Sequence, residues 1–521
     1  MKRKILIAAM FLFACKFIFA QVPTIQWQKS FGGSSYDYTA PVIQTSDGGF
    51  ILAGTTASND GDVSGMHGVA DLWVIKIDSV GTLLWQKCLG GSDYDDAAYV
   101  EVTANILRQT SDGGYVVTGT TYSNDGDVSG NHSGDADMWV AKLDNTGNLQ
   151  WQKCLGGTND DYGNAVQQTT DGGYIVAGYC YSNDGDVTGN HGLYDYWIVK
   201  LSSSGAILWK KCFGGSDEDY AEAIQQTSDG GYIVAGYTWS NDGDVTGNHG
   251  LTDNWVIKID SSGILQWQKC LGGGGNERAV GVQQTSDGGY LINGWTGSSG
   301  GDVNGNHGSD DCWIVKLNNA GILQWQKCLG STTGEGAYSI EATSDGGYII
   351  AASSYGNNGD VNGNHGNSDI WVVKVDNIGT LQWQKSLGGT GDDFGFSALQ
   401  TADGGYIVAG VSESNDGDVT GNHGSQDAWV VKLTFPVGME QLNISSSFNV
   451  YPNPVTNILD LKTSDNSLKN LSIHNLLGEE IMNENFSLQT YSVNVSWVPN
   501  GIYIAEITNG KNIVRKKFVK Q

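Results

Sequence analysis

The fold is decided by one stretch of sequence, AIQQTSDGGYIVAG at residues 223–236, together with WVIKI at 255–259 and LQWQK at 265–269. These short runs are rich in Val, Ile, Tyr and Trp and are separated by turn-forming segments, which is typical of antiparallel strands. The Asp-Gly-Gly at 229–231 predicts a tight hairpin turn, because glycine adopts the positive φ that such turns need. We therefore expect a unit of four short strands, with a long loop at 240–252 between the second and the third.

This unit occurs seven times along the chain. A Trp-(Gln/Lys)-Lys triplet begins at Trp27, Trp85, Trp151, Trp209, Trp267, Trp325 and Trp383. A second Trp, two residues after an Asp, stands at Trp73, Trp139, Trp197, Trp255, Trp313, Trp371 and Trp429. A four-stranded unit repeated seven times predicts an all-β fold, a seven-bladed β-propeller with four-stranded blades. We expect these fourteen Trp side chains to pack between neighbouring blades, since a buried Trp contributes a large apolar area.

The two ends of the repeat region complement each other. Residues 23–29 form a fourth strand with no strands before it, and residues 427–433 form a third strand with no fourth after it. If these two strands pair, the N-terminal strand completes the last blade, and no unpaired sheet edge remains. The alternative is an open solenoid, which would leave both terminal strands unpaired.

Composition and targeting signals limit the function. The chain has 28 Lys and Arg against 56 Asp and Glu, which argues against nucleic acid as a partner. Residues 1–20 have the basic start and short apolar run of a secretory signal peptide, and no later segment is apolar enough for a transmembrane segment. We expect the propeller at 21–435, a linker at 436–447 and a separate C-terminal domain at 448–521.

The long loop carries the most repetitive chemistry, SNDGDVTGNHG at residues 240–250. The pattern favours a structural role, in which the Asp and Asn side chains bond nearby backbone amides. The alternative is a site for Ca²⁺, the one cofactor that the sequence points to, although the distal Glu of an EF-hand loop is missing. The candidate calcium ligands are Asp60, Asp62, Asp125, Asp127, Asp184, Asp186, Asp242, Asp244, Asp416 and Asp418.

Few residues depart from the repeat pattern. Trp239 and Trp295 lie outside the framework and are candidates for ligand stacking. An insertion at 93–107 is expected between the fourth strand of one blade and the first strand of the next, on the face of the long loops. An enzyme should concentrate its unusual residues in one sector, whereas these and Glu277-Arg278 are scattered over several blades, which favours binding. No catalytic residue is assigned, because paired carboxylates recur from blade to blade and no nucleophile motif occurs.

The C-terminal domain has a different composition. It opens with YPNP at 451–454, has LLGEEI at 476–481 and PNGIYIA at 499–505, and ends with VRKKFVK at 514–520. Alternating apolar residues and Gly/Asn turns predict a small β-sandwich. The order of these motifs resembles the type A C-terminal sorting domain of the type IX secretion system. The matching residues are Tyr451, Pro452, Asn453, Pro454, Gly478, Gly501, Tyr503, Lys516 and Lys517.

This resemblance implies a bacterium of the Bacteroidota type, with transport across the outer membrane by the type IX machinery. It also implies removal of the domain by a sortase-like peptidase, followed by release or linkage to surface lipopolysaccharide. The repeats themselves resemble those of secreted bacterial β-propeller proteins, which supports the fold but names no ligand.

Three functions remain open. The first is a secreted or cell-surface binding scaffold for a glycan or a surface protein. The second is a polysaccharide-acting enzyme that uses carboxylates on the loop-rich face of the propeller. The third is a structural component of a surface layer.

Overall fold

The computed structural model describes residues 22–97, 105–132, 134–435, 449–462, 469–475, 480–509 and 512–521. The chain forms two compact units, which divide after Phe435. The predicted signal peptide and linker lie outside the described residues. All the elements within the described ranges are strands, and no helix there could span a membrane.

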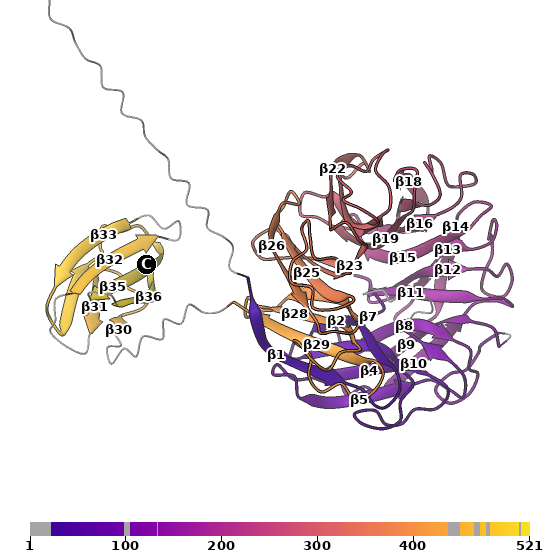
Figure 1. Ribbon diagram of the computed structural model, residues 1–521, viewed down its shortest axis with the longest axis horizontal. Coiled ribbons are helices and arrows are strands. Elements are labelled where there is room, and N and C mark those ends of the chain that lie inside the picture. The colour runs from indigo at the N-terminus through magenta and orange to yellow at the C-terminus, as the bar shows by residue number, and fades with distance from the viewer. Residues whose placement is uncertain are drawn as a thin grey trace, which may run out of the picture. The chain divides into compact units, whose positions relative to one another are not determined.

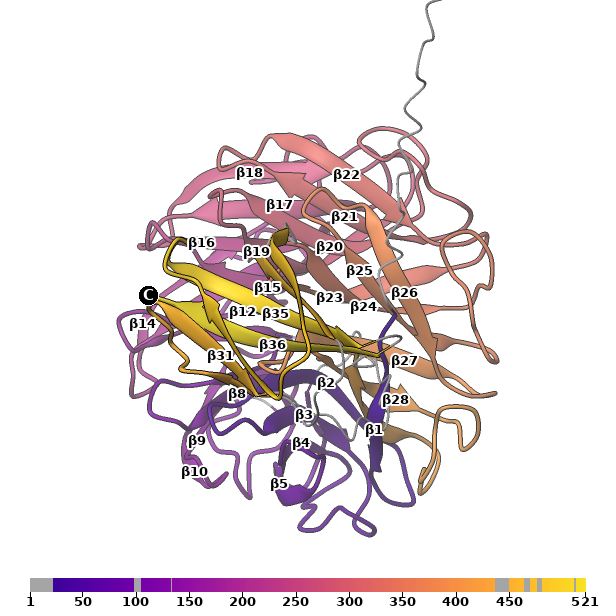
Figure 2. The same ribbon diagram turned by 90° about the vertical axis from the view of Figure 1, so that its left-hand side faces the viewer.

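The first unit, over its described residues, consists of seven antiparallel sheets arranged as the blades of a ring (Figures 1 and 2). Blades 1 and 2 contain β2 (Asp37–Gln44), β3 (Phe50–Thr56), β4 (Asp71–Ile77), β5 (Leu83–Leu89), β6 (Asp95–Asp96), β7 (Leu107–Gln109), β8 (Tyr115–Thr121), β9 (Asp137–Leu143) and β10 (Leu149–Leu155). Blades 3 and 4 contain β11 (Asp161–Gln168), β12 (Tyr174–Cys180), β13 (Asp195–Leu201), β14 (Ile207–Phe213), β15 (Asp219–Gln226), β16 (Tyr232–Thr238), β17 (Asp253–Ile259) and β18 (Leu265–Leu271).

The remaining blades repeat the same order. Blades 5 and 6 contain β19 (Glu277–Gln284), β20 (Tyr290–Thr296), β21 (Asp311–Leu317), β22 (Leu323–Leu329), β23 (Glu335–Ala342), β24 (Tyr348–Ser354), β25 (Asp369–Val375) and β26 (Leu381–Leu387). Blade 7 contains β27 (Asp393–Gln400), β28 (Tyr406–Ser412), β29 (Asp427–Thr434) and, from the other end of the repeat region, β1 (Thr24–Phe31). The prediction of a seven-bladed β-propeller is confirmed.

Strand β1 closes the ring by pairing antiparallel with β29, where Ser30 lies opposite Trp429. The indole Nε1 of Trp429 donates to Oε1 of Gln28 at 2.7 Å. The same bond joins the third and fourth strands within blade 1, where Trp73 donates to Gln86 at 2.9 Å. The closing strand therefore reproduces the contacts of an ordinary fourth strand, as the complementary ends predicted.

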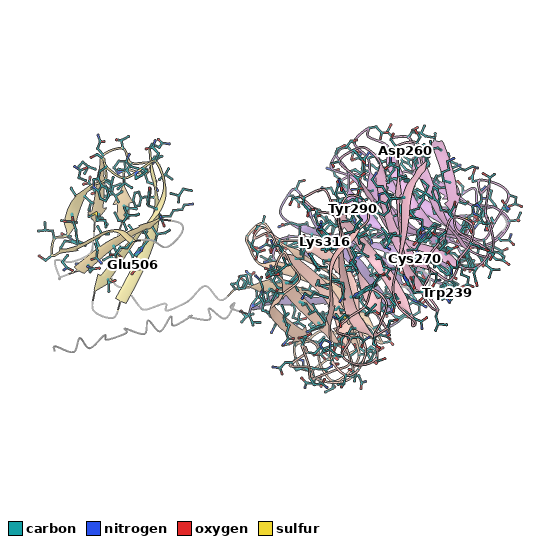
Figure 3. All side chains as sticks on the ribbon, turned by 90° about the horizontal axis from the view of Figure 1, so that it is seen from above. Trp239, Asp260, Cys270, Tyr290, Lys316 and Glu506 are labelled. Carbon is teal, nitrogen blue, oxygen red and sulfur yellow. The ribbon has the colours of Figure 1, made fainter. Side chains whose placement is uncertain are left out.

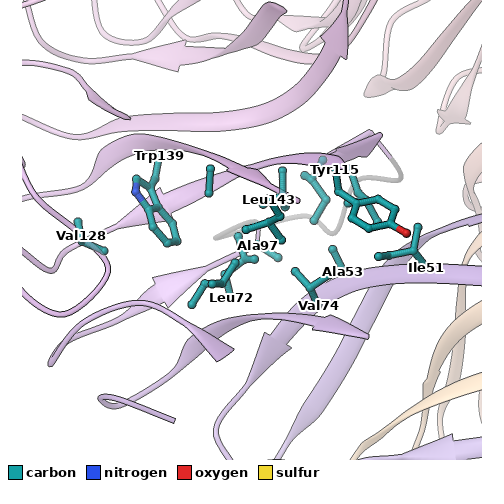
Figure 4. Packing of buried hydrophobic residues seen from close by; sticks show 14 of the residues in the cluster. Ile51, Ala53, Leu72, Val74, Ala97, Tyr115, Val128, Trp139 and Leu143 are labelled. Carbon is teal, nitrogen blue, oxygen red and sulfur yellow. The ribbon is translucent and has the colours of Figure 1, made fainter. Parts of the chain in front are cut away.

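The framework Trp residues form the core between blades, as expected. The third-strand Trp side chains are fully buried in every blade. Trp139 of blade 2 packs in one cluster with Leu72 and Val74 of blade 1 (Figure 4). The fourth-strand Trp27 lies against the turn of the next blade, where a β-carbon on Gly81 would come within 3.0 Å of its ring. Each blade is therefore held by its neighbours through apolar contacts.

A β-bulge interrupts the first strand of most blades. In β15 the register shifts between Ala221 and Ala223, so Glu222 is the extra residue. The prediction began this strand at 223, whereas the structure begins it at Asp219. The extra residue breaks the alternation of side chains and bends the strand, which hides its first half from a pattern search.

The insertion of blade 2 lies at the bulge position. We predicted it between two blades, but β6 and β7 both pair with β8, so the insertion divides a first strand in two. Residues 98–104 lie outside the described part of the chain. Asn105 follows them; its carbonyl accepts from Val166 N at 3.0 Å, and its Nδ2 donates to Val280 O at 3.2 Å. Asn105 therefore joins blade 2 to blades 3 and 5.

The second unit consists of two sheets over its described residues. One contains β30 (Asn449–Tyr451), β31 (Ile458–Lys462) and β34 (Thr490–Asn494), and the other contains β32 (Lys469–Asn475), β33 (Glu480–Phe486), β35 (Gly501–Asn509) and β36 (Asn512–Lys520). Leu461 and Val493 of the first sheet pack with Ile473 and Phe518 of the second. This common core confirms the predicted β-sandwich.

Candidate functional site

The Asp residues of the repeat loops hold the loops in place. Oδ1 of Asp242 accepts from the backbone N of Ser216 at 2.7 Å, and Oδ2 accepts from Ser216 Oγ at 2.8 Å. These hydrogen bonds lower the pKa of Asp242. The first Asp of other long loops makes the equivalent bond to a backbone N, in the pairs Asp60–Ser34, Asp125–Ser92, Asp184–Thr158 and Asp416–Thr390. Each partner lies in the segment that links the preceding blade to the first strand of the same blade. Hydrogen bonds therefore join this segment to the long loop.

The second Asp of the loop also has a structural partner. The backbone N of Asp244 donates to Gly214 O at 2.9 Å, and Asp62, Asp127, Asp186 and Asp418 are held in the same way. Among the described residues, no group of three or more His, Cys, Asp and Glu side chains could hold a metal. Calcium binding at these loops stays a prediction from the sequence.

A buried carboxyl begins the first strand of each blade. Asp219 is fully buried and accepts from Gly215 N at 2.8 Å, from Ser240 Oγ at 3.0 Å and from the Thr238 hydroxyl. Glu277 has this position in blade 5, where it accepts from Gly273 N at 2.8 Å. Glu277 is therefore part of the repeat framework, although the sequence made it look unusual.

Trp239, Arg278 and Trp295 lie together, so the expectation that they are scattered is wrong. The Cζ atom of Arg278 lies 4.7 Å from the ring centroid of Tyr237, 5.8 Å from that of Trp239 and 6.0 Å from that of Trp295. These distances allow cation–π attraction between the guanidinium and the rings. The end of the second strand of blade 4 and the first two strands of blade 5 supply this cluster.

A cavity of about 290 Å³ lies beside Arg278 in blades 3 to 5, and we name it the aromatic pocket. It is lined by Asn164, Tyr179, Glu218, Tyr220, Glu222, Tyr237, Trp239 and Arg278. Trp239 follows the second strand of blade 4 and Asp260 follows the third, so the two mark opposite ends of that blade (Figure 3). The aromatic pocket is at the end that carries the long loops.

The floor of the aromatic pocket is polar and buried. Nδ2 of Asn164 donates to Oε2 of Glu222 at 3.0 Å, and the two residues are 5% and 2% exposed. Burial raises the pKa of Glu222 well above its ordinary value, although the hydrogen bond from Asn164 opposes this shift. A carboxyl group accepts hydrogen bonds in both protonation states and also donates one when it is protonated, so Glu222 can form a hydrogen bond with a hydroxyl of a ligand.

The rim is aromatic and partly exposed. The rings of Tyr220 and Tyr237 stack with centroids 5.1 Å apart, and Trp239 contacts both at 5.8 and 5.3 Å. The Tyr220 hydroxyl donates to Oε2 of Glu218 at 3.0 Å. The pocket thus offers a ring surface for stacking, above groups that form hydrogen bonds.

The sequence predicted Trp239 but missed Glu222, Tyr179 and Tyr220. A signal for Glu222 was present, because the extra residue of the bulge varies in type between blades. It is Asn164, Glu222, Val280, Tyr338 and Phe396 in blades 3 to 7. A position that varies within an otherwise repeated strand indicates a surface at which the folding of the repeat does not require a particular residue.

In the C-terminal unit, the structure joins the first and last sorting motifs. Nδ2 of Asn453 donates to Lys517 O at 3.3 Å, and its Oδ1 accepts from Val519 N at 2.8 Å. The Tyr503 hydroxyl donates to Pro499 O at 2.9 Å. Lys516 and Lys517 lie on β36 opposite β35, which begins at Gly501. Tyr451, Pro452 and Pro454 flank Asn453, and Gly478 lies outside the described residues.

Residues 449–521 match the family model described as a secretion system C-terminal sorting domain. This segment is a type IX sorting domain. The chain is therefore exported by the type IX secretion system to the cell surface or the medium, and its sorting domain interacts with the secretion machinery. The family model covers the sorting domain alone and leaves the ligand of the propeller open.

Solved structures share low identity with the chain, and no curated protein matches it. A Porphyromonas gingivalis protein, PorZ, described as an essential surface component of the type IX secretion system, is 10% identical; the match covers 94% of this chain and 60% of that one, with a TM-score of 0.42. A puromycin hydrolase is 10% identical over 73% of this chain and 59% of its own, with a TM-score of 0.34.

A Synechocystis apocarotenoid oxygenase is 11% identical over 75% of this chain and 88% of its own, with a TM-score of 0.37. The chain thus spans about 60% of the length of the first two of these proteins.

Proposed function

We propose that the exported propeller is a binding scaffold for a glycan, and that the aromatic pocket is its binding site. The proposal rests on one observation, the partly exposed rings of Trp239 and Tyr220 above the buried polar pair of Asn164 and Glu222. A sugar ring has apolar C–H faces that pack on aromatic rings, and hydroxyls that need polar partners. A volume of about 290 Å³ suits a single sugar residue of a longer chain.

A glycan array with the purified chain, its sorting domain retained, tests this proposal. We expect saturable binding to a set of related glycans, and Trp239→Ala should weaken it at least about tenfold, a loss of roughly 1.4 kcal/mol or more. Trp497→Ala is the matched control, because Trp497 is exposed and lies in the sorting domain. Absence of binding to every glycan, or unchanged binding by Trp239→Ala, would contradict the proposal and favour a protein ligand or a structural role.

A second candidate is hydrolysis of the bound glycan. It is favoured by two carboxyls in the same pocket, Glu218 and Glu222, and by the burial that raises the pKa of Glu222. Glycoside hydrolases use one carboxylic acid to protonate the leaving oxygen and a second carboxylate as base or nucleophile.

The release of reducing ends from the bound glycan distinguishes catalysis from binding alone. If the pocket is catalytic, Glu222→Gln should lower kcat by about 10²–10⁴ while binding persists, because Gln keeps the shape but cannot give a proton. Glu413→Gln, an exposed loop residue of blade 7, is the control. No release of reducing ends by the unmodified chain, or full activity of Glu222→Gln, would reject this candidate.

The later steps of export remain proposals that rest on the sorting domain. They are removal of this domain by a sortase-like peptidase and either release or attachment to lipopolysaccharide. The secretory signal peptide and the Bacteroidota source likewise stay predictions from the sequence.

A further inference from the structure

A second cavity, of about 400 Å³, lies in the central channel, and we name it the channel cavity. Every blade contributes residues from the second half of its first strand, just before the Asp-Gly-Gly turn. The aromatic pocket uses the opening half of these strands, so the two sites are at opposite ends of the channel. One repeat position supplies a ring of seven lining residues that differ from blade to blade, namely Ile43, Arg108, Gln167, Gln225, Gln283, Glu341 and Leu399.

Blades 2 to 4 present hydrogen-bond donors to the channel cavity. Oε1 of Gln167 accepts from the backbone N of Gln226 at 2.7 Å, and Oε1 of Gln225 accepts from that of Gln284 at 2.5 Å. Since these oxygens face the neighbouring blade, the amide NH₂ groups of Gln167 and Gln225 remain as donors at the cavity. Arg108 adds a guanidinium beside them, which the carboxylate of Glu341 in blade 6 attracts electrostatically.

Arg108 is held in place by the insertion of blade 2. Its Nη1 donates to Leu107 O at 2.8 Å, and its Nη2 donates to Oδ1 of Asn105 at 3.2 Å. Asn105 lines the channel cavity and is bonded in turn to Val280 O and to Glu222 O. Asn105 therefore joins blades 4 and 5 beside the channel cavity and orients the guanidinium of Arg108.

Blades 5 and 6 present acceptors. Nε2 of Gln283 donates to Oε2 of Glu341 at 3.3 Å, while its Oε1 is buried without a hydrogen-bond partner among the described residues. The Glu341 carboxyl is reached by solvent through the channel, although protein surrounds it. A buried acceptor without a partner is costly, which favours a ligand that donates at this point.

Blades 7 and 1 present an apolar wall. Leu399 and Ile43 occupy the same repeat position as the polar residues, and Val42 extends this wall. The ring therefore has three sectors in order, with donors and a cation first, acceptors and an anion second, and aliphatic side chains third.

We infer that the channel cavity binds a free α-amino acid with an aliphatic side chain. The α-carboxylate would face Arg108 and the two Gln donors, and the α-ammonium would face Gln283 and Glu341. The side chain would lie against Leu399 and Ile43. A peptide lacks a free ammonium and a free carboxylate on one carbon, so it matches this arrangement poorly. The inference does not rest on the proposed glycan site, because the two cavities share no lining residue.

Calorimetric titration of the purified chain, its sorting domain retained, with L-leucine tests the inference. We expect saturable binding, and at least about tenfold weaker binding of leucinamide, which lacks the carboxylate, and of 4-methylpentanoate, which lacks the ammonium. Glu341→Gln and Arg108→Gln should each weaken L-leucine binding at least about tenfold. Leu399→Trp should block the apolar sector and abolish binding, while Trp239→Ala should bind L-leucine as the unmodified chain does.

Three results would overturn the inference. They are no saturation by about 10 mM L-leucine, equal binding of 4-methylpentanoate, or unchanged binding by both Glu341→Gln and Leu399→Trp. If Arg108→Gln fails to fold, Glu341→Gln and Leu399→Trp still test the inference. Both variants are expected to fold, because Glu341 is solvent-accessible and Leu399 is partly exposed. If the unmodified chain binds a glycan but does not bind L-leucine, this inference is rejected and the proposed glycan site is not.

Discussion

Deletion of residues 22–31 is expected to abolish cooperative folding of the propeller. These residues contain β1, which pairs with β29 along its whole length and completes blade 7. Without β1, the indole N–H of the fully buried Trp429 loses its hydrogen bond to Gln28, and part of the Trp429 side chain loses its packing partner. Removing the packing of one large core side chain costs about 3–5 kcal/mol, and a domain is stable by only about 5–15 kcal/mol. The deletion also exposes an edge strand that favours aggregation.

Denaturant unfolding followed by tryptophan fluorescence measures this effect. We expect the deletion variant to lack a sharp transition. As a control, residues 22–31 can be placed after Phe435 through a short turn, because Thr24 pairs with Thr434 at that point. This rearranged chain should regain the transition. An unchanged midpoint after the deletion alone would show that closure contributes little to stability.

The second large effect is a gain in stability when the pH falls from about 8 to about 5. At each junction between blades, the Asp at the start of a third strand lies near the carboxyl that begins the next first strand. A β-carbon on Gly214 would come within 2.6 Å of an oxygen of both Asp195 and Asp219. Both Asp residues are fully buried; Oδ2 of Asp195 lies 2.5 Å from Nδ1 of His191, while its Oδ1 has no hydrogen-bond partner among the described residues. Ionising both therefore places two negative charges close together in a poorly solvated site.

Burial raises the pKa of these carboxyls, to about 7 for Asp161 and Asp219 and to about 6 for Asp95. In the unfolded chain, the pKa of Asp returns to about 3.8. Between these values the folded state binds more protons than the unfolded state, so the free energy of unfolding decreases as the pH rises. One pKa unit corresponds to about 1.4 kcal/mol, and we expect a total change of a few kcal/mol.

Stability should fall again below about pH 4, because other carboxyls have the opposite shift. Asp229 of the hairpin turn accepts from Gly231 N at 2.9 Å and lies 3.1 Å from Nζ of Lys258. These interactions, with the Thr227 hydroxyl, lower the pKa of Asp229 to about 2 although partial burial opposes them. Its contribution is present above the unfolded pKa and is lost as the pH falls through 2. The stability maximum is therefore expected near pH 4–5.

Urea unfolding across this pH range provides the measurement. Asp219→Asn should reduce the slope between about pH 5 and 8, because Asn does not ionise and keeps an acceptor for Gly215. Asp260→Asn is the control, since Asp260 is only half-buried and directly precedes an exposed turn. Stability that rises from pH 5 to 8, or an unchanged slope in Asp219→Asn, would refute this account.

Much of the architecture could be predicted from the sequence because the repeat is local. The Asp-Gly-Gly turn, the two Trp positions and the loop pattern each depend on residues close together in the chain, and Gly230 has the expected positive φ of 84°. The complementary ends predicted the pairing of β1 with β29. The sorting domain could be recognised because its motifs are contiguous.

The aromatic pocket could not be predicted, since its residues come from strands that only the closed ring brings together. Trp239 and Trp295 stand out in the sequence, but nothing local shows that Arg278 lies between them. Glu222 was missed because the bulge breaks the alternation that marks a strand, and Asn105 because the insertion was expected at the end of a strand. By itself, the sequence determined the repeated unit, the closure and the export route. Only the tertiary structure decided which irregular residues meet in the channel, because blade packing and strand bulges set the direction of those side chains.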